Sequence, residues 1–382
     1  MHISKFVTPE IIFGKGALSQ VGECCLRLGA KKVFIVSDPG VMEAGWVDKV
    51  TSVCRSSHLP YEIFCEITPN PKDYEITKGV KVYLASECDA VIGVGGGSAI
   101  DAAKAISILA TNGGNIHDYE GVDKIQYPLP PLVMLPTTAG SGAEVSQFSV
   151  IVDSVRQVKM TIVSKSLVPD IAITDPYTLV TKNRELTAET GMDVLTHAIE
   201  AFVSLAATPL TDVQAKNALT LVAKYLRPST ASHTNEEAKT AMAMASIQAG
   251  LAFSNAILGA VHAMSHAVGG YLDMPHGKLN AILLPYVMEF NLLAAPDKFM
   301  EMAQLMGINI AGLTSAEAGR LAILHVKQLA LDIEIPLCLS EIGLKEEYIP
   351  RMSQAALEDV CILTNPRDVT VSDLDRIFRK AL

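Results

Sequence analysis

The sequence predicts an α/β domain built on a doubly wound parallel sheet, followed by an all-helical domain. Up to about residue 180, short β-branched runs alternate with helical patterns, as expected for successive βαβ units. Beyond residue 182, long Ala-, Leu- and Met-rich stretches repeat apolar residues every three or four positions and contain no convincing strand. A chain of 382 residues is also too long for one ordinary core. We therefore place the two domains at residues 1–181 and 182–382.

Four runs in the first half predict buried parallel strands, because each has a continuous apolar core rather than alternating apolar and polar residues. They are residues 32–38, 90–94, 132–135 and 171–174. Helical patterns at about 40–58, 73–88 and 99–112 fall between some of them. Residues 150–153 and 159–162, separated by a polar bend, predict an inserted hairpin. In the second half, residues 212–226 and 236–255 show the clearest helical spacing.

Composition narrows the class of protein. A net charge of −10 argues against nucleic acid and against anionic membrane surfaces, which both bind basic patches. No apolar stretch approaches the roughly 18 residues of a spanning helix, and the N-terminus lacks the apolar region of a signal peptide. We therefore expect a cytoplasmic protein. The seven cysteines are odd in number and contain no C-x-x-C pair, which predicts free thiols.

One carboxylate and several histidines recur at helical spacing in the second half. Asp193 and His197 lie four residues apart, and so do His262 and His266, so each pair projects from one face of a helix. His276 follows a Met-Pro pair that should turn the chain back. A carboxylate and imidazoles that converge are typical of a first-row divalent metal site. A single histidine is more often a core or surface residue, and spacing alone does not separate His262 from His266 as the ligand.

A glycine-rich turn joins the strand at residues 90–94 to the next helix, and it contains Gly96, Gly97 and Ser98. Glycines let the backbone approach a pyrophosphate closely, and the helix offers free N–H groups and the positive end of its dipole. Asp101 lies one turn into that helix. Tight turns also use glycine for structural reasons alone, but the strand-to-helix context favours a phosphate role. This predicts a Rossmann-like dinucleotide-binding domain.

Two further segments indicate where the rest of a dinucleotide would bind. The usual acidic residue lies about 20 residues after the glycines, whereas the candidate here, Asp38, ends a strand before them. Its carboxylate can accept hydrogen bonds from a ribose diol and would repel a 2′-phosphate, which favours NAD. Because Pro39 and Gly40 follow, Asp38 is also an ordinary turn former. A second polar loop, residues 136–144, offers hydroxyls and backbone amides after another strand.

Together these segments resemble the iron-containing (group III) alcohol dehydrogenase family. The similarity runs nearly end to end and covers residues 9–17, 69–71, 95–101, 136–142, 190–200 and 364–367. The most specific match is Gly-Ala-Val-His-Ala-Met-Ser-His at residues 259–266, followed by Pro-His-Gly at 275–277 and Asn-Ala-Ile-Leu-Leu-Pro at 280–285. One departure is Glu189, where family members often carry a small residue.

The resemblance implies a metal, usually Fe²⁺ with Zn²⁺ as the alternative, and NAD as the cofactor. The implied metal ligands are Asp193, His197, His262 and His276. His266 would then lie near the nicotinamide as a supporting or proton-relay residue. With Asp101 from the glycine-rich turn added, the predicted cofactor-binding residues are Asp38, Asn70, Gly96, Gly97, Ser98, Asp101, Thr137, Thr138, Ser141, Phe148, Lys159, Thr178 and Leu179.

These parts predict an oxidoreductase that moves a hydride between NAD(H) and a small primary alcohol or aldehyde. A divalent cation makes a bound hydroxyl easier to deprotonate, and the nicotinamide carries the hydride. Two alternatives stay open: a catalytically silent regulatory homologue of the same fold, and a lyase resembling 3-dehydroquinate synthase. The lyase would need clustered Lys and Arg near the metal, and residues 191–284 contain few basic residues.

The segment from Phe6 to Ile12 is β-prone and needs a sheet edge to pair with, because an isolated strand is not stable. The family resemblance implies pairing across a two-fold axis, which predicts a homodimer or a higher homo-oligomer. The alternative is an edge strand within a monomer.

Overall fold

The structure is a computed structural model, and it describes residues 5–382. The chain divides into two compact units, Val7–Thr181 and Lys182–Leu382, and Lys5 and Phe6 group with the second unit. The predicted α/β domain had included these two residues. Both residues precede the first strand of that domain, which begins at Glu10. Residues 1–4 of the predicted domain lie outside the described part of the chain.

The α/β unit is built on a six-stranded sheet in the order β1-β9-β6-β4-β2-β3, and every neighbouring pair is parallel. Its strands are β1 (Glu10–Phe13), β2 (Val33–Val36), β3 (Tyr61–Phe64), β4 (Ala90–Gly95), β6 (Leu132–Pro136) and β9 (Ile171–Thr174). The four predicted strands are therefore confirmed. The β3 strand was not predicted, because its sequence is mixed and most of its side chains are only half-buried at the sheet edge.

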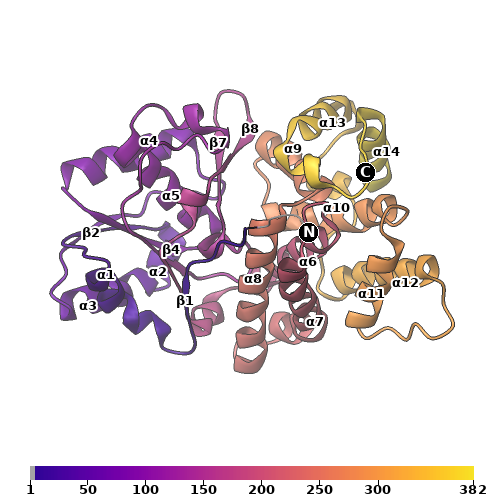
Figure 1. The fold of residues 1–382 in the computed structure, drawn as a ribbon, viewed down its shortest axis with the longest axis horizontal. Helices are drawn as coiled ribbons and strands as arrows, with labels where there is room; N and C mark the ends of the chain where they lie inside the picture. Colours follow the sequence, from indigo (N-terminus) through magenta and orange to yellow (C-terminus); the bar gives the residue numbers. More distant parts are fainter. Residues whose placement is uncertain (1–4) are drawn as a thin grey trace. The chain divides into compact units, whose positions relative to one another are not determined.

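Helices cover both faces of this sheet (Figure 1). On one face, α4 (Asp73–Ala85) and α5 (Gly97–Asn112) pack against Phe34 and Met134. On the other face, α1 (Val21–Arg27) and α3 (Trp46–Ser56) pack against Ile35 and Val133. Successive strand residues point to opposite faces, so a strand buried on both sides must be apolar throughout. The short helix α2 (Pro39–Glu43) follows β2.

The predicted hairpin is confirmed and is longer than expected. Its strands are β7 (Phe148–Asp153) and β8 (Val158–Val163), and they pair antiparallel with Val152 opposite Lys159. Together with β5 (Gly121–Val122), which pairs parallel with β8, they form a second, three-stranded sheet. Short 3₁₀ helices at Ala17–Gln20, Ile116–Tyr119, Ala143–Val145, Lys165–Leu167 and Pro176–Thr181 connect the elements of this unit.

The strand order places the predicted cofactor segments next to one another. The chain runs from β2 to β3 on one side and from β4 to β6 on the other, so β2 and β4 are neighbours where the order reverses. Ligands of open α/β sheets bind at the carboxyl ends of the strands beside such a point. Asp38 follows β2, Gly96 follows β4, and Thr137 follows β6.

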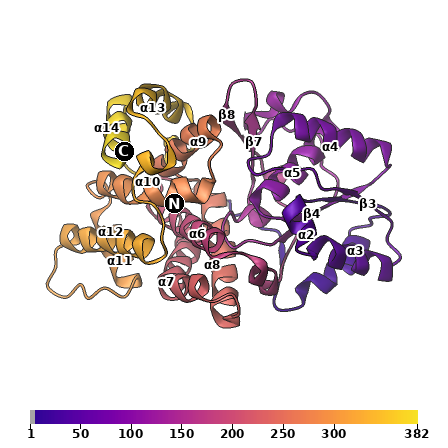
Figure 2. The same ribbon diagram turned by 180° about the vertical axis from the view of Figure 1, so that it is seen from behind.

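The second unit, Lys182–Leu382, is helical throughout, as predicted. Its helices are α6 (Arg184–Val203), α7 (Pro209–Ala231), α8 (Glu236–Ala256), α9 (Ala260–Leu272), α10 (His276–Asn291), α11 (Pro296–Leu305), α12 (Ser315–Asp332), α13 (Ile349–Glu358) and α14 (Val371–Ala381). Short 3₁₀ helices lie at Leu339–Ile342, Glu346–Tyr348 and Val360–Thr364. Figure 2 shows α6, α7 and α8 side by side.

Among the described residues, no single helix has the length and apolar character to cross a membrane. Only α8 and α9 taken together reach that length, and they are bent by 100° at the break between them. All seven cysteines are free thiols, as predicted.

Candidate metal centre and cofactor loops

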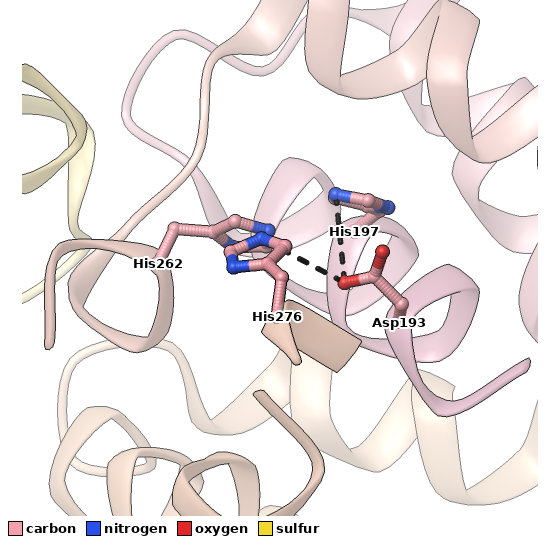
Figure 3. Close-up of side chains that lie close together, drawn as sticks. All are labelled: Asp193, His197, His262 and His276. Atoms are coloured by element: carbon pink, nitrogen blue, oxygen red, sulfur yellow. Dashed lines mark ion pairs between the residues drawn. The ribbon is translucent and has the colours of Figure 1, made fainter. Parts of the chain in front are cut away.

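Three helices bring the four predicted metal ligands together (Figure 3). Asp193 and His197 project from α6, His262 projects from α9, and His276 is the first residue of α10. One ligand atom from each lies within 4.8 Å of the others. The Oδ1 of Asp193 is 3.9 Å from the Nε2 of His197 and 3.9 Å from the Nε2 of His276. The chemistry of this set, one carboxylate and three imidazoles, fits a first-row divalent ion.

The cluster is buried except on the side of His276. The side chains of Asp193, His197 and His262 are 7%, 5% and 1% exposed, whereas that of His276 is 26% exposed. The ring of His197 stacks on Phe253 with their centroids 4.4 Å apart. Packing therefore holds the ligand side chains in place, and solvent reaches the cluster beside His276.

Buried partners orient the histidine rings toward the cluster. The Nδ1 of His262 lies 2.6 Å from the Oε2 of Glu200, and the Nδ1 of His276 lies 3.1 Å from the Oγ of Ser265. Since a carboxylate only accepts, His262 carries its hydrogen on Nδ1 and presents the lone pair of Nε2. Burial, with His197 nearby, also holds the pKa of His262 well below its usual value, so the ring is neutral.

Glu200 is itself held in place by the start of α9. Its carboxylate accepts hydrogen bonds from the backbone N–H groups of Gly259 and Val261, at 3.1 and 2.7 Å. Burial raises the pKa of Glu200 to about 7, although these N–H groups and the nearby His197 oppose the rise. One side chain thus joins α6 to the helix that carries His262.

His266 lies beside the ligands but outside their group. Its ring stacks on that of His276, with the centroids 5.2 Å apart and the planes at 21°. Its Nδ1 lies 2.7 Å from the Oδ2 of Asp359. Burial alone would raise the pKa of Asp359, but His266 and the N–H of Cys361 lower it to about 2. The structure therefore separates His262 from His266, which the spacing alone did not.

Sequence reasoning missed the residues that support the ligands, namely Glu200, Ser265, Asn280 and Asp359. Glu200 lies three residues after His197, and Asn280 lies four after His276, so helical spacing could have indicated both. Asp359 is 93 residues from His266, and no local pattern relates them.

The glycine-rich turn and the second polar loop touch each other at the carboxyl edge of the sheet. A Cβ on Gly97 would lie 2.8 Å from the Cβ of Ser141, and one on Gly96 would lie 3.4 Å from the side chain of Thr138. A Cβ on Gly95 would lie 3.1 Å from the Oδ2 of Asp38. These glycines therefore permit a close approach of three segments that were predicted to bind one cofactor.

Two observations fit a phosphate group at this edge. The N-cap residue of α5 is Gly96, which has no side chain to accept from the N–H groups of the first turn. The Oγ1 of Thr137 is buried and has no hydrogen-bond partner within the described chain. Beside them, the backbone N–H of Asn70 donates to the Oγ of Ser98 at 3.2 Å. The residues present therefore suit the pyrophosphate of a dinucleotide.

The remaining predicted cofactor residues lie around these loops. The backbone carbonyl of Asp101 accepts a hydrogen bond from the hydroxyl of Ser149, at 2.9 Å. The Thr178 hydroxyl donates to the Asp175 carbonyl at 2.9 Å, so this hydroxyl already has a structural role. Phe148, Thr178 and Leu179 are buried, and Lys159 is half-buried on β8. Their contact with a cofactor stays a prediction.

A buried lysine not singled out from the sequence ties α5 to the second polar loop. The Nζ of Lys104 donates to the backbone carbonyls of Ala143, Ser146 and Phe148, at 2.6, 2.7 and 2.9 Å. Burial lowers the pKa of Lys104, and the nearby Asp101 and Glu144 oppose that shift. One ammonium group thus fixes the path of the chain from Ala143 to Phe148.

Comparison with known proteins identifies the family. An "Iron-containing alcohol dehydrogenase" model matches residues 8–176, and "Fe-containing alcohol dehydrogenase family, C-terminal" matches residues 187–382. The chain belongs to the iron-containing alcohol dehydrogenase family. The resemblance inferred from the motifs is therefore confirmed, and so is the predicted fold class.

The relatives of this family member include alcohol dehydrogenases of several substrates. It is 43% identical over 379 residues to 1,3-propanediol dehydrogenase of Klebsiella pneumoniae, covering 98% of each chain. It is 42% identical over 377 residues to NAD-dependent methanol dehydrogenase of Bacillus methanolicus, covering 99% of each. The solved structure of an alcohol dehydrogenase from Oenococcus oeni superposes with a TM-score of 0.97 at 38% identity, covering 100% of both chains. The protein is thus an NAD-dependent oxidoreductase of the alcohol dehydrogenase class.

Proposed function

We propose that the protein interconverts a small primary alcohol and its aldehyde with NAD(H), using Fe²⁺ held by Asp193, His197, His262 and His276. The observation that carries this proposal is the convergence of one carboxylate and three imidazoles from three helices, within 4.8 Å. Names of relatives such as 1,3-propanediol dehydrogenase and NAD-dependent methanol dehydrogenase support small alcohols as the substrate class.

When bound, the divalent ion would lower the pKa of a coordinated hydroxyl or polarise a carbonyl, and NAD(H) would carry the hydride. The chain's own contribution is to hold the ligand atoms and to manage a proton. Glu200 orients His262 through Nδ1, so that Nε2 is available to the ion. Asp359 occupies the Nδ1 of His266 in the same way, which leaves the Nε2 of His266 as the acceptor for the proton that an alcohol releases.

The lyase alternative finds no support in the charges beside the ligands. Lys278 lies two residues after His276. Its Nζ is 2.8 Å from a carboxylate oxygen of Glu185 and 2.9 Å from a carboxylate oxygen of Glu189. Its charge is therefore already balanced within the helical unit. Glu189, the departure from the family pattern, serves as one of these two partners.

Replacing a ligand tests the proposed metal site. We expect His262→Ala and His276→Ala to lose bound Fe²⁺ and to abolish turnover, because three remaining ligands hold the ion much more weakly. Metal content after gel filtration and NADH formation with a panel of primary alcohols provide the two measurements. The matched control is His233→Ala, which removes a histidine of the same unit that lies outside the cluster. Full metal content and activity in either ligand variant would contradict the proposal.

We also propose that the protein works as a homodimer. Pairing of β1 with β9 satisfies one edge of β1 within the chain, and β1 is the last strand of the sheet on that side. An edge strand of this kind offers backbone N–H and C=O groups to a second copy. The family resemblance and this open edge support the dimer.

A further inference from the structure

Asn280 touches three of the four predicted ligands at once. It lies on α10 one turn after His276 and is fully buried. Its Nδ2 is 2.7 Å from the Oδ1 of Asp193, and 3.1 Å from the Nε2 atoms of His262 and His276. A single amide group therefore connects α6, α9 and α10, which are the three helices that supply the ligands.

The chemistry of these contacts identifies the bond that matters. The Oδ1 of Asp193 can only accept, and the Nε2 of His262 accepts because the Nδ1 hydrogen of that ring faces Glu200, so the amide turns its donors rather than its oxygen toward them. Asp193 gives the shortest contact and is the charged acceptor, and hydrogen bonds to a charged group are stronger than those between neutral groups. Each imidazole Nε2 has one lone pair, which the ion would take, whereas the Oδ1 of Asp193 has a second lone pair that can keep the amide hydrogen. The hydrogen bond from Asn280 to Asp193 is therefore the one compatible with a bound ion.

The amide oxygen of Asn280 has no role comparable to that of its N–H groups. The Oδ1 of Asn280 is buried and has no hydrogen-bond partner within the described chain. Burying an unpaired amide oxygen is unfavourable, and an apolar side chain of similar size would avoid that cost. The presence of asparagine at position 280 is thus explained by the hydrogen bonds that its N–H groups donate.

We propose that Asn280 is a further residue of the metal centre, where its amide fixes the carboxylate of Asp193 and thereby sets the affinity for the divalent ion. Asn280 acts as a positioning residue, because it affects the ion through its hydrogen bond to Asp193 and does not itself coordinate the ion. Loss of a group that orients a metal ligand typically weakens metal binding by about 10- to 100-fold. The inference rests on the proposed metal-binding role of the four ligands.

The test is a comparison of Zn²⁺ affinity in the full-length protein. The dissociation constant is measured by competition with a chromophoric chelator after metal removal, so the readout does not depend on activity. Asn280→Leu keeps the size of the side chain and removes both donors, and we expect it to bind Zn²⁺ about 10- to 100-fold more weakly. Asn280→Ser, expected to weaken binding in the same direction, serves if the leucine variant does not fold.

The matched control is Leu284→Ala, one turn further along α10 at a fully buried position. It opens a cavity in the same helix without removing a polar contact to a ligand, so it should lower the melting temperature and leave the Zn²⁺ affinity within about twofold. Equal affinity in Asn280→Leu and the unmodified protein would overturn the inference. An equal loss in the Leu284→Ala variant would also overturn it, because general loosening would then explain the effect. If the unmodified protein bound no Zn²⁺, the proposed function itself would fail.

Discussion

Asp359 lies against His266 although 93 residues separate them along the chain. The carboxylate is nearly buried, and its second oxygen, Oδ1, accepts the backbone N–H of Cys361 at 2.8 Å. This arrangement holds the ring of His266 stacked on His276 and fixes which of its nitrogens carries the hydrogen. The pair thus resembles a catalytic histidine with its orienting carboxylate, placed beside the metal ligands.

A double-mutant cycle tests this pairing. We expect His266→Ala and Asp359→Asn each to retain bound metal and to lower kcat by about 10- to 100-fold, because each disturbs the same proton acceptor. If Asp359 acts through His266, adding Asp359→Asn to His266→Ala should cause no further loss. Independent, multiplying losses in the double variant would show that Asp359 has a different role. Metal content measured on all four proteins separates a loss of the proton path from a loss of the ion.

Asp38 caps α2, and its predicted role in favouring NAD over NADP can be tested by one substitution. Its Oδ1 accepts the N–H of Val41 at 2.9 Å and caps α2, while its Oδ2 lies toward Gly95. We expect Asp38→Gly to raise kcat/KM for NADP(H) by about tenfold, since it removes the charge that repels a 2′-phosphate. Glycine is itself a tolerated N-cap, so the stability cost should stay at about a few tenths of a kcal/mol. If the ratio of kcat/KM for NADP(H) to kcat/KM for NAD(H) did not change, Asp38 would serve only as the N-cap of α2.

Lys104 couples the helix of the glycine-rich turn to the loop that precedes the hairpin. Its ammonium donates to three backbone carbonyls between Ala143 and Phe148, and the side chain is fully buried. The hydroxyls and amides of residues 137–141 lie directly before this anchored stretch. The position of the predicted cofactor loop therefore depends on one buried cation.

Lys104→Met removes that cation and keeps an unbranched apolar chain. We expect it to lower the free energy of unfolding by about 3 kcal/mol and to raise KM for NAD(H) by about tenfold, because three carbonyls lose their donor and the loop shifts. Denaturant unfolding and steady-state kinetics measure the two effects.

Lys239→Met is the matched control, since Lys239 is also buried but donates to the Ser229 carbonyl in the helical unit. It should reduce stability without changing KM for NAD(H). A similar rise in KM in both variants would mean that the effect comes from weakened folding rather than from the loop.

The proposed dimer predicts a particle of twice the 40.8 kDa chain mass in light scattering at micromolar concentration. Removing residues 1–12 would take away most of β1 (Glu10–Phe13), the strand whose open edge is the proposed contact. We expect this truncated protein to be monomeric, because the open edge is gone. A monomer before truncation would reject the dimer, and a dimer that persists after truncation would place the interface elsewhere.

The layout of the α/β unit was largely predictable, because its signals are local. Strands buried on both faces must be apolar throughout, and this explains why residues 32–38 and 90–94 were recognised. The half-buried edge strand β3 has a mixed sequence and was missed. The i,i+4 spacing of Asp193 and His197 likewise follows from helical geometry alone, so this half of the candidate site could be predicted from the sequence.

The chemistry of the metal ligands and the class of fold therefore follow from local periodicity and from motifs that lie within one helix or one turn. The tertiary structure decides which partner each of these groups receives. Glu200 contacts His262, which lies 62 residues away along the chain, and Asp193 contacts Asn280, which lies 87 residues away. The β1 strand pairs with β9 at one edge of the sheet. Such contacts form only when separate helices and strands pack, because a short-range pattern carries no information about which distant surface will face it.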